Sequence, residues 1–189
     1  LNPIDPESKK YFGLLDNDFL KAEFLGSCPK DTLVKKLFNF IEVYENWIEN
    51  DISSKLDNFP QNSKEFASSN LNVCKTVIER IKLSIQNLEK DNDFRNAFQL
   101  ANLAISEQSS WKENAKTFVW RPFQLAFILL VIESFISENR DSKKVADLLW
   151  FPTGGGKTEA YLCIISFLLF KSSFQPKIIS DPGTQVFIR

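Results

Sequence analysis

Seven consecutive residues in the C-terminal half carry the clearest chemical signal in the chain. They are Pro152, Thr153, Gly154, Gly155, Gly156, Lys157 and Thr158. Three adjacent glycines let successive backbone N–H groups turn inward with no Cβ in the way, and N–H groups arranged in that manner bind anions. A helix beginning at Lys157 would add further N–H donors and the positive end of its dipole. The pattern predicts a phosphate-binding loop formed by Thr153 and the three glycines.

The two residues after the glycines suit a nucleoside triphosphate and its cation. We expect the Lys157 ammonium group to contact the β- and γ-phosphates of ATP and the Thr158 hydroxyl to ligate Mg²⁺, which makes them the candidate catalytic pair. The general pattern GxxxxGK followed by Ser or Thr requires a glycine where this chain has Phe151. The remaining residues resemble motif I of superfamily-2 helicases and translocases, which tolerate other residues there. A different P-loop NTPase, such as a small-molecule kinase, is the alternative enzyme.

A second candidate lies upstream, at Gln124 in the sequence Arg-Pro-Phe-Gln. A carboxamide offers both the donor and the acceptor that the N7 and N6 positions of adenine require. Many superfamily-2 motors resemble this chain in carrying Arg-Pro-aromatic-Gln a few tens of residues before the motif I lysine, and here Gln124 precedes Lys157 by 157 − 124 = 33 residues. The resemblance implies that Gln124 selects adenine. The alternative is that it only solvates the start of a buried helix.

Helices are expected to form the N-terminal part. In segments at about 31–50, 74–88 and 91–105, apolar residues recur at steps of three and four, which places each set on one helix face. The sets are Val34, Leu37, Ile41, Tyr44 and Ile48; Cys74, Ile78, Ile81, Ile85 and Leu88; and Phe94, Ala97, Phe98, Ala101 and Ile105. Each set spans only about two heptads, so a bundle packed within the chain is favoured over an intermolecular coiled coil.

The C-terminal part alternates helical and strand-like segments. The apolar stretch 123–136 predicts a buried helix, and a second helix is expected over 157–170. Short apolar runs at 145–151, 177–179 and 185–188 are typical of buried strands. We therefore expect an α/β fold: a helical accessory segment, 1–117, and then 118–189 as the beginning of a first RecA-like ATP-binding domain with a parallel sheet. Asp147, inside the first strand-like run, is expected to pair locally.

Composition excludes several other chemistries. The chain has no histidine, so triads and metal sites that need imidazole are ruled out within it, and its 23 basic against 24 acidic residues give a net charge of −1. The three scattered cysteines are typical of reduced thiols, and no apolar run reaches the roughly 20 residues of a membrane span. We expect a cytoplasmic protein. Because the chain starts at Leu1 and lacks methionine, we expect it to be part of something longer.

Two longer stretches narrow the resemblance. Residues 120–129 and 146–162, with Trp-Phe-Pro before the glycines and Glu-Ala-Tyr-Leu after Thr158, resemble the helicase-like subunit of DISARM anti-phage defence systems. Looser similarity extends to 44–49, 97–102 and 186–189. The resemblance implies the N-terminal part of an ATP-driven DNA helicase or translocase. It also implies that this motor works with a second DISARM subunit and a DNA methyltransferase against phage DNA.

Part of the machinery that such a motor needs is missing from the sequence. Motif II would supply an Asp-Glu pair after an apolar strand, and the only candidate, 178–181, ends in Asp181 without the glutamate. No arginine finger is recognisable either. We therefore expect this chain alone to bind nucleotide poorly and to hydrolyse essentially none. A helical interaction module that uses the loop only as a structural switch is the non-enzymatic alternative.

Overall fold

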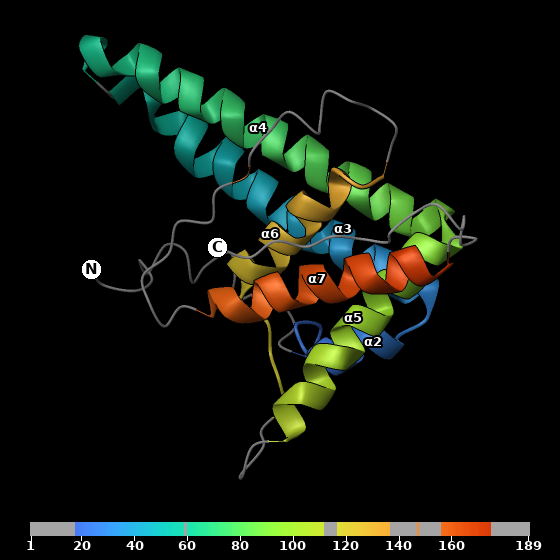
Figure 1. Cartoon of the computed structure of the whole chain (residues 1–189). Coiled ribbons are helices and arrows are strands. Elements are labelled where there is room, and N and C mark those ends of the chain that lie inside the picture. The colour runs from blue at the N-terminus through green and yellow to red at the C-terminus, as the bar shows by residue number, and fades with distance from the viewer. Residues whose placement is uncertain (1–17, 59, 112–116, 137–146, 148–155, 175–189) are drawn as a thin grey trace.

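Helices account for nearly all of the structure. The computed structural model describes residues 18–58, 60–111, 117–136, 147 and 156–174. The α-helices are α2 (Ala22–Ser27), α3 (Lys30–Trp47), α4 (Gln61–Lys90), α5 (Asn92–Ser110), α6 (Pro122–Glu133) and α7 (Lys157–Phe174), and a π-helical turn η1 (Ile48–Ile52) and a 3₁₀ turn η2 (Ser53–Asn58) join α3 to α4. In Figure 1, α3 and the long α4 form a hairpin. Helix α6 packs against α4, and α7 packs against both α5 and α6.

Local sequence explains where the helices begin. Pro29 and Pro60 occupy the positions just before α3 and α4, where a missing N–H group costs nothing. Asp91 separates α4 from α5: its backbone is extended, and its Oδ1 accepts hydrogen bonds from the backbone N–H of Asp93 (2.9 Å) and Phe94 (3.0 Å). Pro122 starts α6 at a position where its fixed φ suits a first helical turn.

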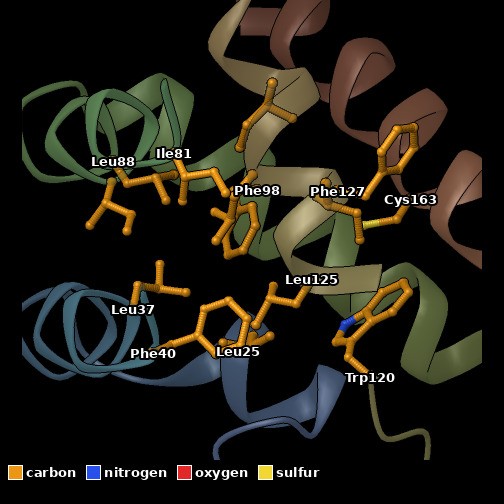
Figure 2. Packing of buried hydrophobic residues seen from close by; sticks show 14 of the residues in the cluster. Leu25, Leu37, Phe40, Ile81, Leu88, Phe98, Trp120, Leu125, Phe127 and Cys163 are labelled. Atoms are coloured by element: carbon orange, nitrogen blue, oxygen red, sulfur yellow. The ribbon is translucent and has the colours of Figure 1, made fainter. Parts of the chain in front are cut away.

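The buried apolar side chains of all six α-helices form one continuous core. Figure 2 shows Leu25 of α2, Leu37 of α3, Ile81 of α4, Leu125 of α6 and Cys163 of α7 converging on it. The predicted helical faces are confirmed, because the members of the three apolar sets are buried, except that Tyr44 and Cys74 lie partly buried against the core. The described helices on either side of residue 117 therefore share this core.

One buried polar pair fixes the segment that leads into α6. The indole Nε1 of Trp120 donates to Asn102 Oδ1 at 2.8 Å, and Asn102 Nδ2 donates to the Phe98 carbonyl at 2.9 Å. Both Trp120 and Asn102 are buried, so each polar group has a partner in place of water. Trp120 is thus a core residue of the bundle, and its hydrogen bond to Asn102 fixes its position against α5.

The predicted α/β class is wrong for the part of the chain that the structure describes. No strand of a sheet occurs there, and the β pairing consists of an isolated antiparallel bridge between Lys21 and Val119. Consequently no RecA-like parallel sheet is present among the described residues. The prediction rested on short apolar runs, whose periodicity does not separate a strand from other buried segments. Those runs, at 145–151, 177–179 and 185–188, lie outside the described residues apart from Asp147.

Two further boundaries differ from the expectation. Helix α4 begins at Gln61, well before the predicted start near 74, because the polar residues of its first turns remain helical while exposed. Helix α5 continues to Ser110 and ends beside Trp111, whose side chain is 75% exposed. Among the described helices, none combines the length and the apolar character needed to cross a bilayer.

Candidate nucleotide-binding site

The start of α7 has the backbone geometry expected at the end of a phosphate loop. Gly156 has a φ of +81°, in the left-handed region that side chains disfavour, and α7 begins at the next residue, Lys157. A Cβ atom at position 156 would also collide with Nε2 of Gln124. The backbone conformation therefore favours glycine here, and a larger residue would in addition displace the end of the Gln124 side chain.

Gln124 connects the two candidate motifs directly. Its Nε2 donates a hydrogen bond of 2.6 Å to the carbonyl oxygen of Gly156, and its Oε1 accepts one of 2.8 Å from the backbone N–H of Arg121. The bond with Arg121 caps the first turn of α6. The bond with Gly156 holds the residue that precedes α7. Gln124 is only 3% exposed. The side chain therefore joins the starts of two helices through a contact between residues 32 positions apart in sequence.

The remaining predicted site residues divide between described and undescribed positions. Lys157 and Thr158 occupy the first turn of α7, where Lys157 is half-buried and Thr158 exposed. Thr153, Gly154 and Gly155 lie outside the described residues. The structure thus brings Gln124 and Gly156 into contact and places Lys157 and Thr158 immediately after them.

Residues with a hydroxyl or carboxylate near this helix start decide how a cation would be held. Thr158 is exposed on the first turn of α7, and hydroxyl oxygens are among the ligands that hard cations such as Mg²⁺ accept. Glu159 lies in the same turn, and its Oε2 is 3.4 Å from where a Cβ of Gly156 would stand. A carboxylate is favoured at the positive end of a helix dipole, which phosphate also prefers. Thr158 and Glu159 are thus the two side chains with oxygen atoms in this first turn of α7.

A small cavity adjoins Thr158. Its volume is about 130 Å³, and it is lined by residues of α5, the segment before α6 and α7: Ile105, Gln108, Ser109, Phe118, Thr158, Glu159 and Leu162. Pockets that hold drug-sized ligands usually measure about 300–1,000 Å³. This cavity is therefore too small for a whole nucleotide.

Packing against α5 and α6 fixes the orientation of α7. Phe167 meets Phe94 of α5 edge to face with ring centroids 4.9 Å apart, and Tyr161 meets Phe127 of α6 at 5.9 Å. Cys163 lies between these contacts and is fully buried, and that burial raises the pKa of its thiol. Since the helix is held along its length, the direction of its N-terminal N–H groups is fixed by the core.

Sequence reasoning missed Arg80, an ion-pairing residue on α4. Its guanidinium group binds Asp147 through Nη1 and Nη2, at 2.7 and 2.8 Å, and Glu133 through Nε at 2.9 Å. The expectation that Asp147 pairs locally is wrong, because its partner lies 67 residues away in sequence. An acid inside an apolar run signals a buried partner, and the run itself does not say which basic residue supplies it.

Comparison with known proteins shows which proteins the chain resembles. No protein-family model matches it. The DISARM protein DrmA of Bacillus paralicheniformis is 36% identical over 180 aligned residues, which cover 87% of this chain and 16% of that relative. The similarity includes most of the chain, while the chain spans a small part of the relative's length. These residues therefore belong to a DISARM-related protein.

Proposed function

We propose that this chain is the ATP-binding part of a superfamily-2-type DNA helicase or translocase that acts in defence against phage DNA. The observation that carries the proposal is the hydrogen bond from Gln124 Nε2 to the Gly156 carbonyl. It joins the candidate adenine-selecting residue to the candidate phosphate loop, two motifs that the sequence separates by 32 residues. The relative named DISARM protein DrmA supports the defence role.

Each residue has a defined part in the proposed reaction. Backbone N–H groups of Gly154, Gly155 and Gly156 and the start of α7 bind phosphate oxygens, with Thr153 beside them. Lys157 neutralises charge on the β- and γ-phosphates, which increases as the terminal phosphoryl group departs. Thr158 ligates Mg²⁺, and the cation supplies further charge neutralisation when bound.

Gln124 is proposed to select adenine while it supports the loop. A carboxamide nitrogen carries two hydrogens and its oxygen two lone pairs, so the bonds to Gly156 and Arg121 use one position on each atom. Because the side chain is buried, adenine would have to approach the first turn of α6 closely. Binding of adenine to Gln124 would then alter the contact between Gln124 and Gly156 directly.

DNA-stimulated ATP hydrolysis by the intact protein tests the proposal. We expect hydrolysis to rise with added DNA and to be lost in Lys157→Ala, while Lys171→Ala, at the other end of the same helix, behaves as the parent. Hydrolysis without any DNA effect would favour another P-loop NTPase, such as a small-molecule kinase. No hydrolysis by the parent would favour a helical interaction module.

The preference for ATP over GTP distinguishes a helicase or translocase from a small-molecule kinase more sharply than the effect of DNA on hydrolysis does. Gln124→Ala should reduce the preference for ATP over GTP if its carboxamide selects adenine. An unchanged preference would contradict the proposed role of Gln124.

The proposed partners are phage DNA, a second DISARM subunit and a DNA methyltransferase, and the proposed place of action is the cytoplasm.

A further inference from the structure

An open groove lies along one face of α5, the helix that packs against both α2 and α7 (Figure 1). Its volume is about 390 Å³, and binding pockets usually measure about 300–1,000 Å³. The side chains that matter for its chemistry come from all three helices: Glu23 of α2, Leu100, Leu103, Ala104 and Glu107 of α5, and Phe170 of α7. The groove is therefore large enough to hold side chains of another molecule.

The floor of the groove is apolar and follows the helical period of α5. Leu100, Leu103 and Ala104 are separated by steps of three and one, so they face the same side of the helix. Phe170 adds an aromatic ring from α7, and Phe174 follows it one turn later on the same face of that helix. Leu103 is 36% exposed and Phe174 37% exposed. Apolar surface that solvent reaches beside a groove is typical of a site for another protein chain.

The groove also carries negative charge that its lining does not offset. Glu23 and Glu107 are both exposed, and neither forms an ion pair with a residue that the structure describes. None of the described residues that line the groove is basic. Glu107 lies in the last turn of α5, which contains no basic residue, so its charge adds to the negative end of the helix dipole. A cation placed over the groove would therefore be favoured.

We propose that this groove binds a segment of another protein in which an apolar side chain is flanked by lysine or arginine. The apolar side chain packs on Leu100, Ala104 and Phe170, and the flanking cations pair with Glu23 and Glu107. Charge decides the class of partner, because the two carboxylates repel the phosphates of a nucleic acid and would stay unpaired against a partner without basic residues.

The groove is separate from the candidate nucleotide site. Phe170 follows Lys157 on α7 by 170 − 157 = 13 residues, which is about 20 Å along the helix axis at 1.5 Å per residue. The inference thus goes beyond the proposed function and does not depend on it.

Two variants address the two parts of the groove, each with a matched control. Ala104→Trp fills the floor from a half-buried position, and Gln86→Trp places the same side chain at an exposed position of α4. Glu107→Lys reverses one charge beside the floor. Its control is Glu89→Lys, since Glu89 is exposed in the last turn of α4, as Glu107 is in the last turn of α5, and does not line the groove.

The test measures binding of two fluorescein-labelled peptides to the intact protein by fluorescence polarisation. Both peptides carry the same leucines, flanked by lysines in one and by glutamates in the other. We expect the lysine peptide to bind, and to slow hydrogen exchange over 100–107, while the glutamate peptide does not bind. Glu107→Lys should weaken binding about threefold to tenfold, and less at high salt, because the lost ion pair is exposed. Ala104→Trp should abolish binding, and both controls should bind as the parent does.

Three results would overturn the proposal. The first is that the lysine peptide fails to bind the parent or binds no better than the glutamate peptide. The second is equal binding to the parent, Ala104→Trp and Glu107→Lys, which would place the peptide elsewhere on the surface. The third is self-association of the intact protein that Ala104→Trp abolishes, which would assign the groove to a second copy of this chain. Each result leaves the proposed function standing, because these variants change no residue of the candidate nucleotide site.

Discussion

Replacing Gly156 by alanine adds one carbon atom, Cβ, at the junction of the two candidate motifs, where Gln124 contacts Gly156. Alanine at a φ of +81° costs about 1–2 kcal/mol. The new Cβ also collides with Gln124 Nε2, which must move away from the Gly156 carbonyl and lose a hydrogen bond worth about 1 kcal/mol. The sum is about 2–3 kcal/mol, which is less than the roughly 5–15 kcal/mol that holds a domain together. We therefore expect the helices to persist while the junction opens.

Native-state hydrogen exchange of the intact protein measures this local opening. Amides in the second turns of α6 and α7 should exchange roughly 30- to 100-fold faster in Gly156→Ala, because each 1.4 kcal/mol corresponds to a factor of ten. Adding Gln124→Ala removes the collision but not the backbone strain. The double variant should therefore be less damaged than the sum of the single ones. Unchanged exchange in Gly156→Ala, or strict additivity of the pair, would refute the reasoning.

Three other predictions follow from buried groups. Asn102→Leu leaves the Trp120 N–H without its partner and should destabilise the protein by about 1–3 kcal/mol in urea unfolding, whereas a neutral result would mean that water replaces the partner. Burial, with a smaller effect of Cys74, raises the pKa of Tyr44 to about 12, so the contribution of Tyr44 to stability should be constant below pH 10 and fall between pH 10 and 12. Tyr44→Phe should remove that part of the fall. Cys163 should resist alkylation at pH 8 for as long as the protein stays folded, as mass spectrometry of the modified peptides would show.

The helices were predictable because their apolar faces are periodic. Leu37 and Ile41 of α3 and Ile81 and Ile85 of α4 recur at the helical period and are all buried. The first turns of α4 gave no such signal, since they are polar and mostly exposed, and only Pro60 marks where the helix begins. The predicted parallel sheet is absent from the described residues, and the apolar runs on which that prediction rested are too short to define a period.

The candidate site was predictable where it depends on local geometry. A run of glycines before Lys157 indicates unusual backbone, and Gly156 has it. The contact between Gln124 and Gly156 was not foreseen, although both residues had been assigned to the same site. Arg80 was missed altogether because ion pairs between distant elements leave no periodic pattern. Of that ion pair, the sequence indicated Asp147, an acid inside an apolar run, but not Arg80.

Binding of Mg²⁺ and ATP to the intact protein, measured by isothermal titration calorimetry, tests the central claim most directly. The account predicts that the parent binds ATP, that Lys157→Ala binds about tenfold to a hundredfold more weakly through loss of a charge-assisted hydrogen bond, and that Lys171→Ala binds as the parent does. Absence of binding by the parent, or equal affinity in Lys157→Ala, would contradict it.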